Sequence, residues 1–262
     1  MHVEVRAYAE LVDLLGAASA EAPVGEPRSV KDLVESVGLP HPEIDLLLVD
    51  DEPVGFDHLV RGGERVAVYP PLRSLGADSE VSLWPTPPEP RRFVLDVHLG
   101  TLARRLRLLG FDSWYATDAD DALLAEVAVG QERILLTRDR GLLMRRAIVH
   151  GYCPRSDDPE EQAREVSERY DLAERARPLS RCVRCNGVLV PVDREQILDL
   201  LPPRTRREFD RFAQCLDCAQ VYWPGSHVDA VEGFVNDIVR PNDGTRPSDD
   251  ASQTPPPPPP DA

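Results

Sequence analysis

The hydrophobic and polar positions follow two different patterns along the chain. In residues 1–71, short apolar runs alternate with polar turns rich in Gly, Pro and Asp. From Arg92 to about Tyr170, short apolar runs alternate with stretches whose apolar residues recur every three to four positions. The first pattern is typical of short strands joined by turns, and the second is typical of alternating strands and helices.

The first region predicts a small β-grasp fold. We expect strands at 3–6, 46–49 and 65–69 and a helix around 30–37. The segments 50–53 and 61–64 have the Gly, Pro and Asp content of tight turns. Residues 72–91 contain four closely spaced prolines between 85 and 90, so we interpret them as a linker.

The second region, residues 92–175, predicts a parallel sheet with helices on its faces. We expect strands at 93–97, 113–116, 133–137 and 148–152, and helices at 100–109, 120–129, 140–147 and 159–170. In the first helix, Leu102, Leu106 and Leu109 form a stripe that packs inward. Three arginines lie off that stripe and predict a cationic face: Arg104, Arg105 and Arg107.

Carboxylates follow the predicted strands of this sheet. Asp96 and Asp139 each come after an apolar run, and Asp121 lies in the first turn of the helix that follows the second strand. The carboxyl ends of parallel strands meet at one edge of a sheet, so we expect these acids to converge. Convergent carboxylates repel one another unless a cation lies between them, which predicts a Mg²⁺ or Mn²⁺ site. Such a site activates water to attack a phosphodiester.

Each of these acids also has a structural interpretation, because Asp commonly caps helices. We prefer that interpretation for Asp118 and Asp120. Asp157 and Asp158 follow the fourth strand and offer either a further carboxylate ligand or an ordinary helix entry.

The charge distribution bears on the substrate. The formal net charge is −16, but residues 1–90 hold 17 acids and 6 bases, whereas residues 91–150 hold 8 acids and 10 bases. The basic surplus therefore coincides with the predicted carboxylate site. A phosphodiester fits this combination of acids and bases, with Arg104, Arg107 and Arg138 as candidate contacts to phosphate. The alternative is that the arginine face is only solvated and contacts no ligand.

The chain has five cysteines, and four of them form C-x2-C-x29-C-x2-C: Cys182, Cys185, Cys215 and Cys218. Two such pairs predict a zinc ribbon, here over residues 176–240, with a helical stretch near 194–200 in the spacer. Four thiolates leave no open position on Zn²⁺, so the metal would be structural. Free reduced cysteines are the alternative. Cys153 is left over, and we expect it to be buried.

No signal peptide and no run of about 20 apolar residues is visible, so we expect a cytoplasmic protein without membrane contact. The sequence does not indicate an oligomeric state. Residues 241–262 end in six consecutive prolines before Asp261, and their composition predicts a disordered tail.

Several local motifs together resemble the Mut-7 C-terminal RNase family. They occur in the family's order: Asp96, the stretch 99–112, Leu136–Leu142 around Asp139, Arg181–Gly187 around the first cysteine pair, and Trp223–His227. The resemblance implies a PIN-type nuclease domain fused to a zinc ribbon, with RNase activity and with Asp96, Asp121 and Asp139 as metal-binding acids. Asp120 is the alternative to Asp121, because the short Asp-rich run can be aligned in two ways.

Residues 1–71 are similar to the ubiquitin-like β-grasp domain that often precedes this family's nuclease domain. The segment has no terminal Gly-Gly, which argues against a role as a sulfur carrier or conjugated modifier. We expect its acidic charge to repel RNA and instead to bind a protein partner or to shield the basic site.

The sequence therefore predicts a metal-dependent ribonuclease that acts on RNA. The alternative is a module that binds RNA or a ribonucleoprotein without cleaving it. A zinc-dependent redox protein is a third hypothesis, disfavoured because both C-x-x-C pairs lie in ribbon-like contexts.

Overall fold

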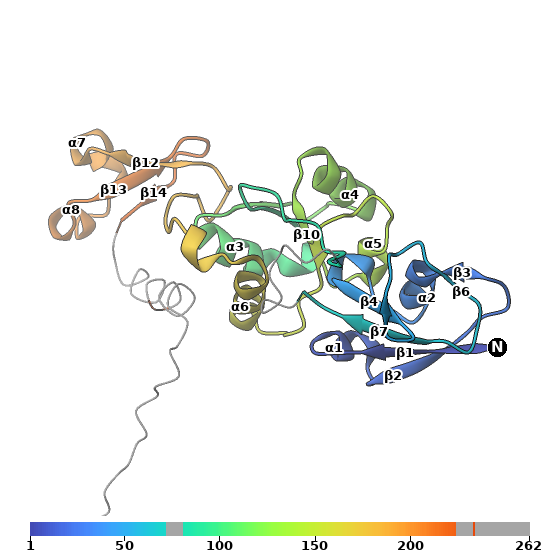
Figure 1. Ribbon diagram of the computed structural model, residues 1–262. Helices are drawn as coiled ribbons and strands as arrows, with labels where there is room; N and C mark the ends of the chain where they lie inside the picture. Colours follow the sequence, from blue (N-terminus) through green and yellow to red (C-terminus); the bar gives the residue numbers. More distant parts are fainter. Residues whose placement is uncertain (72–80, 224–232, 234–262) are drawn as a thin grey trace, which may run out of the picture.

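The computed structural model describes residues 1–71, 81–223 and 233. Figure 1 shows three folded parts, with the N-terminal domain and the cysteine-containing domain at opposite ends of a central domain. The predicted tail at 241–262, the linker residues 72–80 and His227 lie outside the described residues. Within the described part of the chain, no helix is both long enough and apolar enough to cross a bilayer.

The N-terminal domain has the predicted β-grasp fold. Its five-stranded sheet has the order β2-β1-β7-β4-β5, in which β1 and β7 are parallel and the other pairs are antiparallel. These strands are β1 (His2–Ala7), β2 (Ser19–Pro23), β4 (Leu46–Val49), β5 (Glu52–Pro53) and β7 (Arg65–Tyr69). The helices are α1 (Leu11–Leu15), α2 (Val30–Ser36) and a 3-10 turn, η1 (His41–Glu43). Two short strands, β3 (Arg28–Ser29) and β6 (Leu59–Val60), pair separately.

The local sequence explains the ends of the helices in this domain. The Ser29 side chain accepts a hydrogen bond from the Asp32 amide at 3.0 Å and so caps α2. Helix α1 ends at Gly16, whose φ of 73° favours glycine. Strand β2 was not predicted because its sequence, Ser-Ala-Glu-Ala-Pro, has few residues typical of strands.

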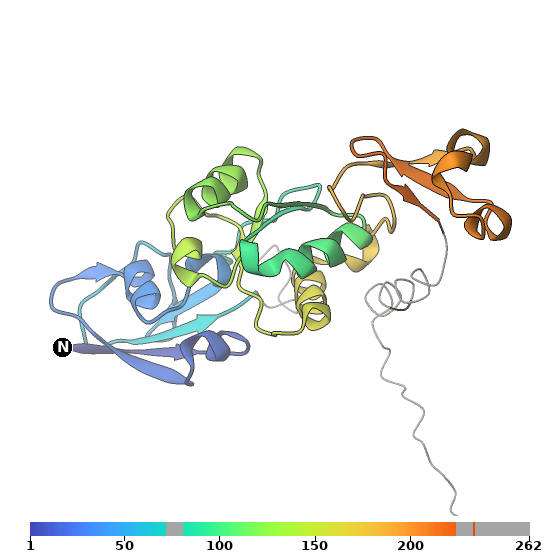
Figure 2. The ribbon, with the colours of Figure 1, turned by 180° about the vertical axis from the view of Figure 1, so that it is seen from behind.

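The central domain contains the predicted parallel sheet, with the strand order β11-β10-β8-β9. Its strands are β8 (Arg92–Leu95), β9 (Asp112–Tyr115), β10 (Ile134–Leu136) and β11 (Gly151–Tyr152). Helices α3 (Gly100–Leu108) and α6 (Pro159–Tyr170) cover one face, and α4 (Asp121–Gly130) and α5 (Arg140–Leu143) cover the other (Figure 2). Both faces of the sheet are therefore buried, as its apolar strands require.

Two elements of the central domain are at least three residues shorter than predicted. Helix α5 ends at Leu143 rather than at 147, and β11 begins at Gly151 rather than at 148. The apolar run Ala147-Ile148-Val149 suggested a strand, but the Ile148 carbonyl accepts a hydrogen bond from His41 of the β-grasp domain at 2.9 Å instead of pairing with a strand. The local sequence pattern does not reveal this contact between the domains.

The third part is a three-stranded antiparallel sheet, formed by β12 (Leu189–Val192), β13 (Phe212–Cys215) and β14 (Val221–Tyr222). The helical prediction near 194–200 is confirmed by α7 (Arg194–Ile197) and the 3-10 turn η5 (Leu198–Leu200), and α8 (Thr205–Glu208) follows. A small apolar cluster holds these helices against the sheet: Ile197, Leu201, Phe212 and Val221.

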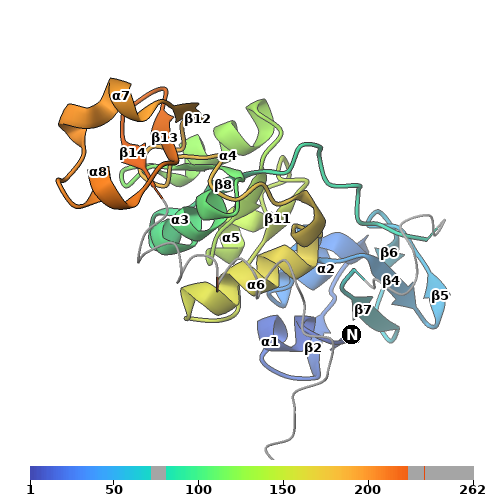
Figure 3. The same ribbon diagram turned by 90° about the vertical axis from the view of Figure 1, so that its left-hand side faces the viewer.

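The β-grasp domain and the central domain share one hydrophobic core. Buried residues of both, such as Leu33 and Ile44 in one and Leu142 and Ile148 in the other, belong to a single continuous cluster. The described part of the predicted linker is also packed, because the Leu83 amide donates to the Asp45 carbonyl at 2.6 Å. Figure 3 shows the two domains side by side.

Candidate metal centres and carboxylate edge

Asp96 follows β8 at the carboxyl end of the central sheet and is only 6% exposed. Its Oδ1 accepts a hydrogen bond from the His98 amide at 2.7 Å and so caps a 3-10 turn, η3 (Val97–Leu99). Its Oδ2 accepts from the Thr137 hydroxyl at 2.5 Å and from the Arg138 amide at 3.3 Å. The carboxylate is therefore held in one orientation by three donors.

Asp139 lies on the neighbouring strand connection and caps α5. Its Oδ1 accepts from the amides of Gly141 at 2.7 Å and Leu142 at 3.2 Å. Because both of these hydrogen bonds fall on Oδ1, they leave Oδ2 available to a ligand.

Thr137 links the two acids. Its side chain is fully buried, its hydroxyl donates to Asp96, and the same oxygen accepts from the Asp139 amide at 2.9 Å. The parallel register pairs Leu95 with Leu136, which brings Asp96 and Thr137 level at the ends of β8 and β10. We call the edge formed by Asp96, Thr137 and Asp139 the carboxylate edge. Thr137 therefore holds the two acids together through its hydroxyl.

Asp121 is the first residue of α4, and its side chain is half exposed. The Arg145 guanidinium lies 3.6 Å from its carboxylate and donates to its backbone carbonyl at 3.0 Å. The preceding residue, Asp120, caps the helix by accepting from the Leu123 amide at 2.8 Å, as the capping interpretation predicts. Arg145 was not among the predicted site residues, because only the fold brings the end of α5 to the start of α4.

The carboxylate edge has the chemistry of a hard-cation site. Mg²⁺ is usually held by one or two carboxylates and keeps several waters, so Asp96 and Asp139 are sufficient in number and type. Among the described residues, however, the four cysteines are the only group of three or more ligating side chains close enough to share one ion. Asp121 is paired with Arg145 rather than gathered with the other two acids.

The predicted phosphate contacts differ from one another. Arg104 is exposed on α3, and Arg138 is exposed beside the carboxylate edge, where it donates a hydrogen bond to Asp157. This ion pair raises the pKa of Arg138. Asp158 caps α6 by accepting from the Glu160 amide at 2.8 Å, which is the ordinary helix entry.

Arg107 departs from the predicted cationic face. It is 5% exposed, and its guanidinium donates to the Ser113 carbonyl at 2.8 and 3.0 Å and to the Val183 carbonyl at 3.1 Å. Burial lowers its pKa. The helical periodicity placed Arg107 outside the leucine stripe, on a side of α3 that we expected to face solvent. In the structure, this side of α3 faces β9 and the first cysteine pair. The structure therefore corrects our expectation: Arg107 joins two parts of the fold and is not placed to bind a substrate.

The four predicted zinc ligands converge. All four sulfur atoms lie within 4.8 Å of one another, with Cys182 and Cys218 separated by 3.6 Å and Cys185 and Cys215 by 3.4 Å. Tetrahedral zinc with Zn–S bonds of about 2.3 Å requires sulfur separations of about 3.8 Å, so this set fits the ion. Burial raises the pKa of Cys182, but the Tyr222 hydroxyl and two backbone N–H groups donate to its sulfur and lower that pKa to about 7.

The first cysteine pair is anchored on the central domain through Asn186. Its amide group accepts from the Ser113 amide at 2.9 Å and donates to the Asp112 carboxylate at 2.7 Å. That carboxylate also accepts from Arg133 at 2.7 Å. Burial raises the pKa of Asp112, but the hydrogen bonds from Arg133 and Asn186 outweigh it and hold the pKa below its usual value. Sequence reasoning missed this group, because its members are far apart along the chain.

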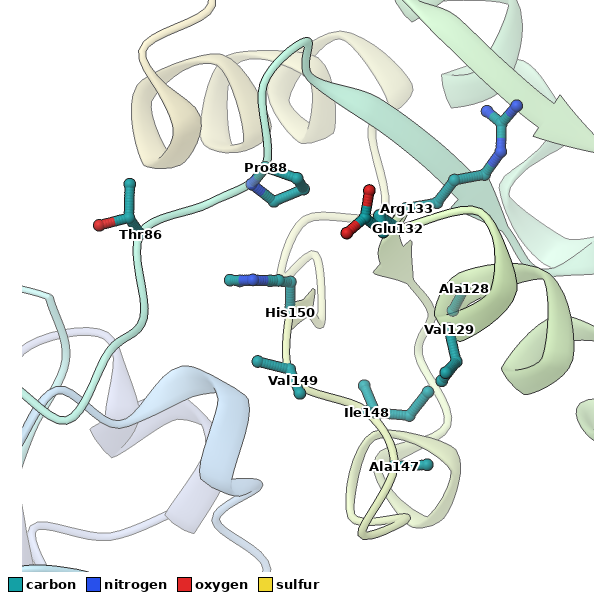
Figure 4. A pocket seen from close by; sticks show the side chains of 10 residues that line it. All are labelled: Thr86, Pro88, Ala128, Val129, Glu132, Arg133, Ala147, Ile148, Val149 and His150. Atoms are coloured by element: carbon teal, nitrogen blue, oxygen red, sulfur yellow. The ribbon is translucent and has the colours of Figure 1, made fainter.

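A cavity of about 350 Å³ lies at the opposite, amino-terminal ends of the strands. Figure 4 shows its lining, which includes Arg133 before β10, His150 before β11, and apolar residues such as Val129 and Ile148. Burial lowers the pKa of His150. None of the predicted site residues lines this cavity, so it is separate from the carboxylate edge.

Comparisons with known proteins agree with this domain order. The family described as Mut7-C RNAse domain matches residues 91–235, and the one described as Mut7-C ubiquitin matches residues 1–75. Among solved structures, small archaeal modifier protein 1 of H. volcanii is 19% identical, covers 27% of this chain and 98% of its own, and has a TM-score of 0.24. A Pyrococcus furiosus protein described as a molybdopterin converting factor, subunit 1, is 24% identical, covers 28% of this chain and 99% of its own, and has a TM-score of 0.24. No curated protein matches the chain.

Proposed function

The chain belongs to the family of the Mut7-C RNAse domain, and on that premise we propose that it is a metal-dependent ribonuclease whose site is the carboxylate edge. The observation that carries the proposal is the Thr137 hydroxyl, which connects Asp96 and Asp139 through hydrogen bonds of 2.5 and 2.9 Å. Two carboxylates fixed at adjacent strand ends are the ligands that Mg²⁺ or Mn²⁺ requires.

A bound Mg²⁺ or Mn²⁺ would supply an activated water and stabilise the charge that develops on the leaving oxygen of a phosphodiester. The chain's own residues hold that site in place. The His98 amide and the Thr137 hydroxyl orient Asp96, and the first turn of α5 orients Asp139. Arg138 is beside these acids and Arg104 is exposed on α3, so both are our candidates for contacts with RNA phosphates.

Asp121 is our candidate for a third metal-binding acid. In this arrangement its carboxylate is 3.6 Å from Arg145, so it would have to leave that partner before it could bind a metal. The four cysteines would hold a structural zinc, and they leave no open position on that ion for catalysis.

A second function is favoured by the Asp121–Arg145 pair. If Asp121 serves only to hold α4 against α5, the central domain and the zinc ribbon would bind RNA or a ribonucleoprotein without cleaving it. The two functions predict the same affinity for RNA but different outcomes once a divalent metal is added.

Cleavage of end-labelled single-stranded and structured RNAs with Mn²⁺, Mg²⁺ or EDTA tests the proposal. We expect Asp139→Asn to lower the metal-dependent rate by roughly 10³-fold, because it removes a metal ligand and its charge. Asp118→Asn is the matched control, because it removes an exposed acid from the loop before α4. Undiminished cleavage by Asp139→Asn would refute the site, and RNA binding by the wild type without cleavage in either metal would favour the second function.

A further inference from the structure

The β-grasp domain contacts the central domain next to the carboxylate edge. The 3-10 turn η1 packs against β11, and the two domains share one hydrophobic cluster. The contact also includes polar groups of the β-grasp domain, which form hydrogen bonds with particular segments of the central domain.

Glu43 of η1 is the most buried acid in this contact, with 0% exposure. Arg155 donates to both of its carboxylate oxygens, at 2.9 and 2.6 Å, and the Cys153 amide donates to Oε1 at 2.7 Å. A buried carboxylate held by two donating groups fixes the geometry of both. Glu43 therefore fixes the segment that directly follows β11.

That segment adjoins the carboxylate edge. Leu136 pairs with Tyr152 in the sheet, and the Thr137 amide donates to the Tyr152 carbonyl at 3.2 Å. Thr137 in turn donates to Asp96 and accepts from Asp139. A shift of the chain after β11 would thus be passed to the residue that links the two acids.

The β-grasp domain also holds α5 from both sides. Arg140, the first residue of this helix, donates to the Leu14 carbonyl at 2.6 Å. Beyond the end of the helix, His41 bonds the Ile148 carbonyl at 2.9 Å. Helix α5 has only four residues, so it depends on tertiary contacts for its stability. Asp139 caps this helix, and its carboxylate keeps its orientation only while the helix is in place.

We propose that the β-grasp domain is a positioning part of the carboxylate edge. Glu43 holds the end of β11 through Arg155, and the Leu14 carbonyl holds the start of α5 through Arg140, so that Asp96 and Asp139 keep their relative placement. The catalytic meaning of this positioning rests on the proposed ribonuclease function. The positioning itself is a property of the metal-free chain.

Hydrogen exchange of the full-length, zinc-loaded protein without Mg²⁺ or Mn²⁺ tests the positioning directly. We expect Glu43→Gln to speed exchange in residues 137–143 and 153–156 by about tenfold or more, because Arg155 loses its charged partner. Arg140→Met is the second variant, in case Glu43→Gln does not fold. It removes only the hydrogen bond to the Leu14 carbonyl and should leave the chain folded. We expect it to speed exchange in residues 140–143 alone.

Glu64→Gln is the matched control. Glu64 accepts from the amides of Arg61 and Gly62 in a turn of the β-grasp domain, and its substitution weakens that domain without touching Glu43 or Arg140. Exchange at 137–143 that is unchanged in both Glu43→Gln and Arg140→Met, or that rises equally in Glu64→Gln, would overturn the proposal.

The kinetic consequence is measured separately. We expect Glu43→Gln to raise the Mn²⁺ concentration for half-maximal cleavage by about tenfold and to change the KM for RNA by less than that, because Arg104, a candidate phosphate contact on α3, lies outside the affected segments. An equal rise in the Mn²⁺ concentration that Glu64→Gln requires would show that the effect comes from general destabilisation, and it would contradict the proposal. If the wild type cleaves no RNA, the proposed function fails, whereas the exchange experiment still decides the positioning.

Discussion

The cysteine cluster and the carboxylate edge are both predicted metal sites, and the chain builds them differently. All four thiols lie within 4.8 Å of one another, and each pair comes from a C-x-x-C segment only four residues long. At the carboxylate edge, Thr137 links Asp96 to Asp139, but Asp121 is paired with Arg145.

The difference follows from the chemistry of the ligands. Thiol groups can approach one another before a metal binds, whereas ionised carboxylates repel and are stabilised by donors and by arginines. The cysteine cluster is therefore formed by its own ligands, while the carboxylate edge depends on Thr137 and on the packing of neighbouring elements.

Removing one cysteine of the cluster should have the largest effect. We expect Cys215→Ser to lose zinc and to unfold the ribbon, because structural zinc contributes on the order of 10 kcal/mol to folding. Zinc content by elemental analysis and circular dichroism measure the two results. Cys153→Ser is the control, because Cys153 is buried outside the cluster and the substitution should leave the zinc content unchanged. Full zinc retention by Cys215→Ser would show that the cluster is not a four-thiolate site.

Asp112→Asn tests the anchor between the ribbon and the central domain. The change leaves the Arg133 guanidinium, whose side chain is 8% exposed, without its charged partner, and should cost about 3 kcal/mol of stability in urea unfolding. Because folding lowers the pKa of Asp112, its stabilisation is present above the unfolded pKa and is lost as the pH falls through the folded pKa.

The wild type and Asp112→Asn should therefore differ near pH 6, begin to converge as the pH falls below about 4, and become equal only below the lowered pKa of folded Asp112. Asp157→Asn is the control, because that carboxylate is 89% exposed and its loss should change stability by less than about 1 kcal/mol. If the difference in stability between the wild type and Asp112→Asn stays the same well below pH 4, the stabilisation does not come from the negative charge of Asp112.

Arg145→Gln should have the smallest effect. The pair with Asp121 is 41% and 50% exposed, and exposed pairs contribute about 0 to 1 kcal/mol. If Asp121 is a metal ligand restrained by Arg145, the substitution should lower the Mn²⁺ concentration for half-maximal cleavage by up to about fivefold. A higher Mn²⁺ requirement in the variant would instead indicate that Arg145 supports the site.

The sequence predicted the elements that depend on local chemistry. Helix α6 has its expected bounds, since Asp158 caps it, Pro159 begins it, and Asp171 ends it with a φ of 52°. The cysteine cluster was predicted in full because its spacing is short and its ligand type is specific. The position of Asp96 and Asp139 at one edge was predicted because parallel strands bring their carboxyl ends together.

Other features could not be predicted, because they depend on contacts between distant segments. Periodicity placed Arg107 off the apolar stripe but could not show that β9 and the first cysteine pair cover it. The pattern also gave no sign that Glu43 would pair with Arg155, which lies 112 residues later. The pattern likewise gave no sign that the chain beyond α5 contacts the β-grasp domain, where His41 bonds the Ile148 carbonyl.

Mn²⁺ binding to the zinc-loaded protein tests the central claim most directly. Electron paramagnetic resonance would count the Mn²⁺ ions held by the wild type and by the double variant Asp96→Asn/Asp139→Asn. We predict that the wild type retains Mn²⁺ and that the double variant loses it while keeping its full zinc content. Equal Mn²⁺ retention by the two proteins would show that the metal does not bind at the carboxylate edge and would contradict the account.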